Sequence, residues 1–205
     1  MKKKYSDIIG EHYEKHAHDW DRDRQRSTWI ERPWIDRFVE KLSAGATVLD
    51  LGCGSGRPIA QYMADHNIRI TGIDASQSMI KLCRDRLPGH DWIAADMRGL
   101  HLERQFNGIL AWDSFFHLKD TDQRKMFAVF ARHACEGSLL MFNTGTEHTE
   151  RIGEYRGDPL FHSSLAQYEY WSLAEASGFD VVQYATNETT AGGRTVWPCQ
   201  QRDRS

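Results

Sequence analysis

The chain has 205 residues and is 40% hydrophobic, so it is long enough to bury a sizeable core, and its length favours one domain over two. Its 26 basic and 29 acidic residues leave a formal net charge of −3, which argues against a surface that binds nucleic acid. The four cysteines form no CxxC pair. No long apolar stretch follows the basic residues 2–4. We therefore expect a cytoplasmic protein with no zinc site, disulfide framework, signal peptide or membrane span.

Residues 1–45 contain no strand signal and are expected to form a helical lid on a core at 46–205, all within a single domain. An apolar pattern at 29–42 predicts a helix packed on this core, and the His- and Asp-rich stretch before it predicts a mobile cover. That stretch holds three histidines with the spacing of metal ligands, His12, His16 and His18. Because no carboxylate–histidine pattern of a metal enzyme surrounds them, we expect a solvated polar helix face and no metal.

From residue 46 onward, apolar runs alternate between strand-like and helix-like spacing. In chain order, the expected elements are a strand at 47–51, a helix at 59–65, a strand at 68–74, a helix at 77–86, strands at 91–94 and 106–112, a helix at 122–133, a strand at 138–143, a helix at 165–176, and strands at 179–185 and 194–199. This alternation predicts an α/β protein with a mostly parallel sheet covered by helices on both faces. The last two strands have no room for a helix between them, so they should pair antiparallel.

The stretch VLDLGCGSGRP, residues 48–58, joins a buried strand to a helix through three glycines. Glycine allows a sharp turn and a close approach by a ligand, and turns of this kind hold nucleotide-like ligands in α/β proteins. The spacing is G-x-G-x-G, at Gly52, Gly54 and Gly56, whereas a dinucleotide fingerprint has its third glycine where this chain has Arg57. No Gly-Lys-Ser/Thr follows, so the turn is not a Walker phosphate loop.

Acidic residues accompany the ends of three successive strands. Asp50 lies in the first strand, Asp74 ends the second and Asp96 follows the third. Such carboxylates suit a ligand with a ribose and an ammonium group but no phosphate, which describes S-adenosylmethionine better than any dinucleotide. Simpler interpretations stay open, because the glycines can form a plain tight turn, Asp74 can cap the next helix, Asp96 can be a surface turn residue, and Met79 can belong to the core.

Six motifs, in order and at characteristic spacing, resemble the class I S-adenosylmethionine-dependent methyltransferases. They are VLDLGCGSG (48–56), ITGIDASQSMI (70–80), AADM (94–97), ILAWDSFFHL (109–118), YWSLAEASGFDVV (170–182) and GGRTVWPC (192–199). The resemblance covers nearly everything from residue 46 on. It implies a Rossmann-like, doubly wound sheet of seven strands with an antiparallel C-terminal hairpin, S-adenosylmethionine as cofactor and S-adenosylhomocysteine as product.

The resemblance also implies roles for residues at matching positions. Asp50 and the glycine turn would hold the methionine end of the cofactor, Asp74 would bind the ribose hydroxyls, and Asp96 would accept from the adenine amino group. Tyr13 and Trp20 in the lid would close over the sulfonium. The full set of implied cofactor-binding positions is Tyr13, Trp20, Asp50, Gly52, Cys53, Gly54, Gly56, Asp74, Ala75, Met79, Asp96, Met97 and Trp112.

Three residues are candidates for acid–base chemistry. His117 follows the fourth strand at the rim of the expected pocket and titrates near neutral pH, so it is the first candidate for a general base. His162 is the second, and Asp113 would orient either histidine or hold a cationic substrate. If residues 113–117 begin a helical turn, Asp113 and His117 share a face, and the carboxylate raises the histidine pKa. The alternative is a local ion pair that only shapes the loop.

The absence of one motif narrows the range of possible methyl acceptors. WDSF stands after the fourth strand where families that methylate nitrogens in polymers carry Asn/Asp-Pro-Pro-Tyr. We therefore expect transfer of a methyl group to a small molecule by direct in-line displacement, in a monomer or homodimer that binds neither nucleic acid nor membrane. A non-catalytic sensor or partner subunit that binds S-adenosylmethionine or S-adenosylhomocysteine is the alternative. A nicotinamide oxidoreductase is disfavoured by Arg57.

Overall fold

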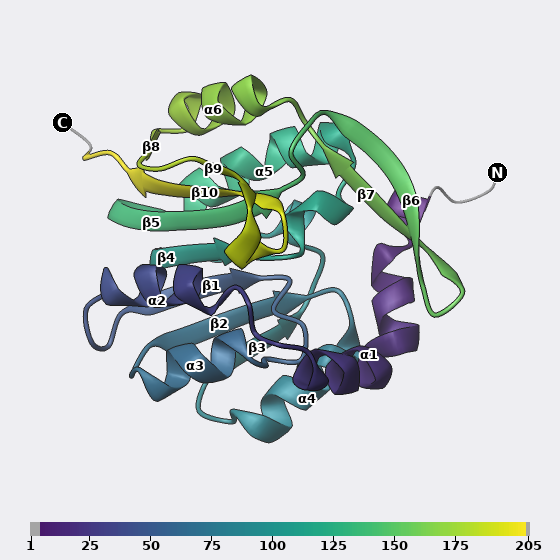
Figure 1. Ribbon diagram of the computed structural model, residues 1–205. Coiled ribbons are helices and arrows are strands. Elements are labelled where there is room, and N and C mark those ends of the chain that lie inside the picture. Colours follow the sequence, from purple (N-terminus) through teal and green to yellow (C-terminus); the bar gives the residue numbers. More distant parts are fainter. Residues whose placement is uncertain (1–4, 204–205) are drawn as a thin grey trace.

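A computed structural model describes residues 5–203, and its centre is a twisted sheet with helices on both faces (Figure 1). Seven strands follow the order β3-β2-β1-β4-β5-β10-β8, and β9 pairs with β10 as an eighth strand. The strands of this sheet are β1 Thr47–Leu51, β2 Arg69–Asp74, β3 Asp91–Ala94, β4 Phe106–Ala111, β5 Ala134–Thr144, β8 Phe179–Val181, β9 Ala185–Glu188 and β10 Arg194–Gln201. The helices are α1 Ile9–Arg26, α2 Arg32–Glu40, α3 Ile59–Asp65, α4 Gln77–Arg86, α5 Asp120–His133 and α6 Gln167–Ala176.

The pairing of the strands confirms the expected Rossmann-like sheet. β1 is parallel to β2 and β4, β2 to β3, and β4 to β5, whereas β10 runs antiparallel to β5, β8 and β9. Because the first five strands are parallel, their carboxyl ends lie along one edge of the sheet, where open α/β sheets bind ligands. No helix within residues 5–203 is long and apolar enough to cross a membrane.

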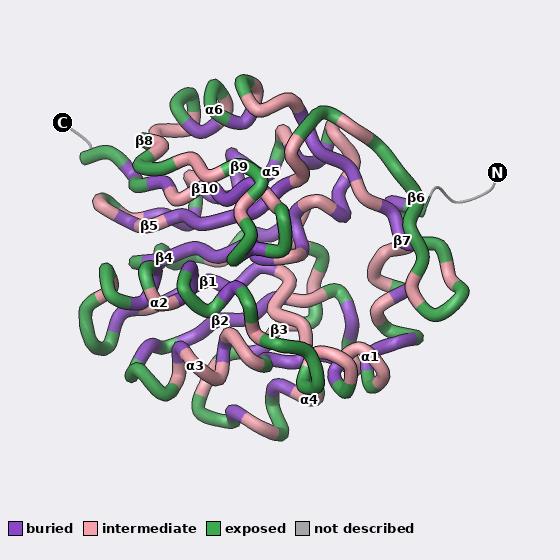
Figure 2. Tube along the Cα trace, viewed as in Figure 1, coloured by how far each residue is buried: buried purple, intermediate pink, exposed green. Residues whose placement is uncertain are grey.

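Successive residues of the central strands face opposite sides of the sheet and enter two separate cores. Leu49 and Ile109 point toward α5 and α6, in a core rich in phenylalanine, while Val48 and Leu110 point toward α2, α3 and α4. These strands are buried on both faces, which explains why they are continuous apolar runs rather than alternating ones. Figure 2 shows this burial along the central strands and the exposure of the outer helical turns.

From residue 46 on, most predicted boundaries of helices and strands lie within two residues of the observed ones. The exceptions lie in the C-terminal half of the chain. β5 begins four residues before the expected 138–143 strand, and the expected strand at 179–185 divides into β8 and β9. No strand was expected between 143 and 165, but this segment forms an antiparallel hairpin of β6 Thr149–Tyr155 and β7 Asp158–Ser164. This hairpin forms a sheet of its own and lies beside α1 (Figure 1).

The helical nature of the lid is as expected, although residues 1–4 of it lie outside the described residues. One prediction about the lid was wrong. His12 and His16 are buried, with only 8% and 6% of their surface exposed, and His18 alone lies on the solvated face. The physical reason is the unpredicted hairpin, because Tyr155 of β6 packs its ring against both imidazoles.

Candidate functional site

A cavity of about 340 Å³ opens at the carboxyl ends of the parallel strands, with α1 across it. Its walls come from the glycine turn after β1, from Asp74 and Ala75 after β2, from 95–98 after β3 and from 112–114 after β4. Tyr13, Trp20 and Arg24 line the cavity from α1. The position agrees with the ligand crevice of doubly wound sheets.

The glycine turn is held in place by the neighbouring strands. The backbone N–H groups of Gly52 and Cys53 both donate to the carbonyl of Ile73, at 2.7 and 3.0 Å. Gly52 has a φ of +80°, and a Cβ on it would lie 2.2 Å from the Cβ of Ser114, so a side chain has no room there. Gly54, with a φ of +54°, has open space where a Cβ would be. The turn therefore requires glycine for its conformation and presents bare backbone beside the cavity.

Asp50 lies at the floor of the cavity without a counter-charge. Only 4% of the Asp50 surface is exposed to solvent. No group within residues 5–203 donates a hydrogen bond to the Asp50 carboxylate or forms an ion pair with it. Burial, together with the neighbouring Asp74 carboxyl, raises the pKa of Asp50 to about 7. A buried carboxylate that lacks a partner is unfavourable in its charged form, so this position favours a cationic ligand.

Asp74 shapes the turn and still faces the cavity. Its two carboxylate oxygens accept from the backbone N–H groups of Gly54 and Ser76, both at 2.9 Å. Burial outweighs these bonds and raises the pKa of Asp74 to about 6. The cap of α4 is Ser76, whose hydroxyl accepts from the N–H of Met79 at 3.1 Å, so Asp74 is not the helix cap. Each carboxylate oxygen has a second lone pair available for a ligand hydroxyl.

The far end of the cavity carries a paired charge. The Asp96 carboxylate accepts from the guanidinium of Arg98 at 2.5–3.0 Å, and from its backbone N–H at 2.9 Å. Arg98 also bonds to Asp122 of α5 at 3.1 Å. Asp96 thus lies at the expected cavity edge with part of its hydrogen-bonding capacity already used.

α1 is fastened over the cavity by two sets of polar contacts with α4 and the residues before it. Glu14 accepts from the hydroxyls of Ser76 and Ser78 at 2.6 and 2.7 Å, and Asp21 receives two bonds of 2.6 Å from Arg86. These contacts hold the Tyr13 and Trp20 face of α1 toward the cavity. α1 therefore covers the cavity in this structure.

Tyr13 and His117 form a buried pair at the cavity wall. The Tyr13 hydroxyl lies 2.8 Å from Nε2 of His117, and Nδ1 of His117 lies 2.8 Å from the carbonyl oxygen of Phe161. Since a carbonyl only accepts, Nδ1 carries the hydrogen, and Nε2 accepts from the Tyr13 hydroxyl. Burial lowers the pKa of His117 to about 3, so the imidazole is neutral at physiological pH.

The amino-acid sequence was compared with known proteins. Residues 48–137 match a family model described as a methyltransferase domain. Over 194 residues the chain is 25% identical to O-methyltransferase rstn1 of Aspergillus nomiae, covering 86% of this chain and 85% of that protein. It is 31% identical over 100 residues to malonyl-acyl-carrier-protein O-methyltransferase of Salmonella typhimurium, covering 48% of this chain but only 39% of that protein.

Solved structures show the same fold. The 1,6-didemethyltoxoflavin-N1-methyltransferase of Burkholderia thailandensis, with S-adenosylhomocysteine bound, superposes with a TM-score of 0.76 at 19% identity, covering 97% of this chain and 89% of that one. Magnesium protoporphyrin IX methyltransferase of Synechocystis, with S-adenosylmethionine bound, gives 0.73 at 14% identity, covering 97% and 98%. Residues 48–137 thus form a methyltransferase domain, and the chain has the fold of the class I S-adenosylmethionine-dependent methyltransferases. These two solved structures hold S-adenosylhomocysteine and S-adenosylmethionine, the product and the cofactor expected from the sequence.

The cavity of this methyltransferase gathers all but one of the positions expected to bind the cofactor. The exception is Gly56, which has a φ of +78° and faces Cys83 of α4 instead. Its role is conformational, because a Cβ there would lie 3.2 Å from the Cys83 sulfur. The individual contacts of the other positions with the cofactor stay predictions.

The predicted pairing of Asp113 with His117 was wrong. Asp113 has a φ of +50°, and the following turn at Phe115–His117 is a 3-10 helix, so the two side chains do not share an α-helical face. The Asp113 carboxylate instead contacts Asn143 at 2.6 Å and Arg194 at 2.9 and 3.0 Å. Without a carboxylate beside it, the pKa of His117 moves down rather than up.

The three candidate catalytic residues occupy different places. His117 and Asp113 line the cavity, whereas His162 does not. The His162 ring stacks on Phe116, with centroids 5.5 Å apart, and lies 4.8 Å from the His117 ring. His162 therefore packs behind the cavity wall as a neighbour of His117.

Arg24 is a cavity residue that the sequence interpretation missed. It follows Trp20 by one helical turn, and Trp20 follows Tyr13 by two, so the three share one face of α1. That spacing was present in the sequence and would have identified Arg24 once the helix and its inward face were known. Burial lowers the pKa of Arg24, and the Asp113 carboxylate opposes that effect.

Proposed function

We propose that this methyltransferase transfers a methyl group from S-adenosylmethionine to a small-molecule acceptor by direct in-line displacement. The observation that carries the proposal is the unpaired, buried carboxylate of Asp50 in a cavity covered by α1. S-adenosylmethionine bears a sulfonium and an ammonium group, so it supplies the positive charge that Asp50 lacks. A dinucleotide brings negative phosphates to the same place and is disfavoured.

The residues present fit the rest of this donor as well. We assign the ribose hydroxyls to Asp74, whose oxygens retain free lone pairs beside the glycine turn. Asp96 and Met97 line the cavity after β3, where they suit the adenine ring. The ammonium group belongs beside Asp50. With this order, we expect the methyl group to lie toward Tyr13 and Trp20, which line the cavity from α1.

A small acceptor is supported by the closure of the site. α1 lies across the cavity and is fastened to the core at Glu14 and Asp21, so an acceptor has to fit beneath this helix. The relatives with broad coverage agree, since the Burkholderia enzyme was solved with 1,6-didemethyltoxoflavin bound. The near-neutral charge of the chain gives no support to a nucleic-acid acceptor.

The chain contributes alignment and exclusion of water to the reaction. The bond from sulfur to the methyl carbon breaks as the bond from the acceptor atom forms, and S-adenosylhomocysteine leaves. Holding the acceptor in line supplies about 7–11 kcal/mol of the barrier reduction. His117 is neutral and accepts a hydrogen bond from Tyr13, so we assign it to positioning the Tyr13 hydroxyl beside the acceptor.

Turnover tests this proposal directly. Purified protein is incubated with S-adenosylmethionine and pooled small-molecule acceptors, and S-adenosylhomocysteine formation is measured. Acceptor-dependent release supports the enzyme, while tight binding without turnover across broad pools supports the sensor alternative. With an acceptor identified, His117→Ala should mainly raise the acceptor KM. A fall in kcat of about 10²–10⁴-fold would instead make His117 the general base.

A further inference from the structure

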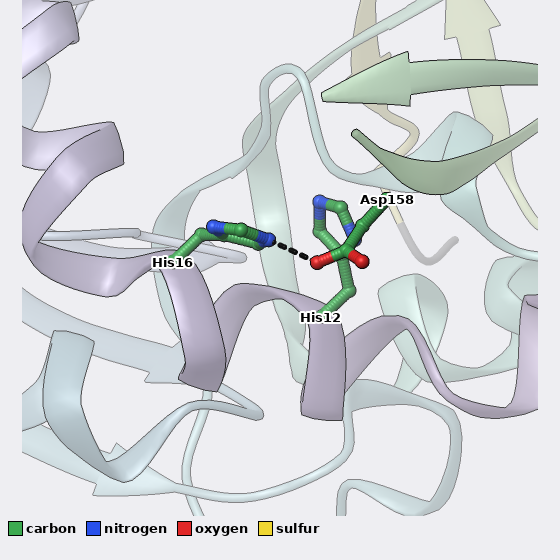
Figure 3. Close-up of side chains that lie close together, drawn as sticks. All are labelled: His12, His16 and Asp158. Atoms are coloured by element: carbon green, nitrogen blue, oxygen red, sulfur yellow. Dashed lines mark hydrogen bonds and ion pairs between the residues drawn. The ribbon is translucent and has the colours of Figure 1, made fainter. Parts of the chain in front are cut away.

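Three potential metal ligands meet between α1 and the β6–β7 hairpin, apart from the cofactor cavity. His12 and His16 lie one turn apart on α1, and Asp158 begins β7 (Figure 3). Nε2 of His16 lies 2.5 Å from Oδ2 of Asp158, and the imidazole centroids are 5.0 Å apart. One nitrogen from each histidine and one carboxylate oxygen all lie within 4.8 Å of one another.

The cluster contains a buried polar side chain, His12, that lacks hydrogen-bond partners among the described residues. Only 8% of the His12 surface is exposed to solvent, and its Nε2 atom is fully shielded. Within the described part of the chain, neither ring nitrogen of His12 has a hydrogen-bond partner. A buried polar nitrogen without a partner is unfavourable. The Asp158 side chain keeps 31% of its surface exposed, which gives an ion and its water ligands access.

We propose that His12, His16 and Asp158 bind a divalent transition-metal ion of the zinc type. Two histidines at i and i+4 on one helix face are a recurrent zinc-binding arrangement, and imidazole and carboxylate are ligands that Zn²⁺ takes. The ion completes its tetrahedral shell with water at the exposed side. None of the three residues lines the cofactor cavity, so the site is separate from the one proposed for methyl transfer.

Lys15 is the competitor for this position. Its ammonium group lies 2.5 Å from the same Oδ2 of Asp158, and its side chain is 65% exposed. A bound ion displaces this flexible cation and draws the three ligands together, since donor atoms around tetrahedral zinc lie about 3.3 Å apart. The metal then ties α1 to β7 and holds the lid against the hairpin. Removal of Lys15 should therefore strengthen metal binding, which an ordinary surface ion pair does not predict.

The test uses the full chain without a histidine tag, stripped with a chelator and dialysed. Zn²⁺ is titrated by calorimetry, and Co²⁺ replaces it as a spectroscopic probe of tetrahedral nitrogen and oxygen ligation. We expect one ion per chain at micromolar affinity or tighter. His12→Ala, His16→Ala and Asp158→Asn should each weaken binding at least about tenfold. His18→Ala, which removes an exposed histidine from the same helix, is the matched control and should leave affinity unchanged.

Lys15→Met should tighten Zn²⁺ binding, and Zn²⁺ should slow amide exchange in α1 of the wild-type chain. Circular dichroism and retained S-adenosylmethionine affinity establish that each variant is folded. The proposal is overturned if the stripped protein binds neither ion at micromolar concentrations. It is equally overturned if binding survives both His12→Ala and His16→Ala, because the ion then lies elsewhere.

Discussion

The affinity for S-adenosylmethionine should rise with pH, because Asp50 has to be ionised to hold a cation. Its pKa in the free protein is raised to about 7 by burial and by Asp74. The carboxyl is therefore roughly 10% ionised at about pH 6 and roughly 90% ionised at about pH 8. If the cofactor binds only when Asp50 is ionised, this carboxyl alone should lower the Kd about tenfold over this range, and it should release close to one proton on binding at about pH 6.

Calorimetry in buffers of different ionisation enthalpy measures both the Kd and the proton release. Asp50→Asn keeps the shape of the side chain and removes its titration. This variant should bind about 10- to 100-fold more weakly at pH 8, as expected for the loss of a charge-assisted contact. Its remaining pH dependence should not exceed about twofold, the part contributed by Asp74 with its pKa of about 6.

Stability provides the control for this experiment. A carboxyl whose folded pKa lies above its unfolded value of 3.8 destabilises the fold as pH rises toward 7, because the unfolded state ionises first. Asp50→Asn should therefore unfold at a temperature no lower than wild type at pH 8. A wild-type Kd that is independent of pH, or a variant with the wild-type pH profile, would refute the assignment of Asp50.

The remaining predictions concern the turn and the lid. Asp74→Ala should weaken S-adenosylmethionine binding by at least about tenfold in calorimetry, and an unchanged Kd would restrict Asp74 to shaping the turn. Gly52→Ala should lower the free energy of unfolding by about 1–3 kcal/mol more than Gly45→Ala, since both have positive φ but only the former meets Ser114; equal denaturation midpoints would contradict this. The cofactor should slow hydrogen exchange across residues 5–28, and identical exchange with and without it would argue against a lid.

The core of the fold was predictable because its signals are local. β1, β3, α3 and α4 have the expected boundaries, since each is an apolar run or a helical period bounded by turn residues. The glycine turn and Asp74 were likewise recognised from short-range spacing. Their surroundings follow from a parallel sheet, which brings the carboxyl ends of several strands to one edge whatever the intervening loops contain.

The hairpin was missed because β6 is exposed along nearly its whole length and carries no apolar alternation (Figure 2). Its partner β7 packs against α1 and the turn at Phe115–His117 rather than against the main sheet. Two features of the structure depend on this hairpin and were therefore missed as well. The burial of His12 and His16 depends on Tyr155 of the hairpin, and the tautomer of His117 depends on a carbonyl in β7. Neither contact has a signature within its own stretch of sequence.

The independence of the β6–β7 hairpin has an evolutionary consequence. Among the described strands, β6 and β7 pair only with each other, so an insertion or a replacement in 149–157 breaks no hydrogen bond of the main ladder. The hairpin, none of whose residues lines the cavity, can thus diverge at a different rate from the part of the protein expected to receive the donor. A chimera that carries a different turn and outer strand in this segment, but keeps Tyr155 against Trp20 of α1, should fold and bind S-adenosylmethionine as before.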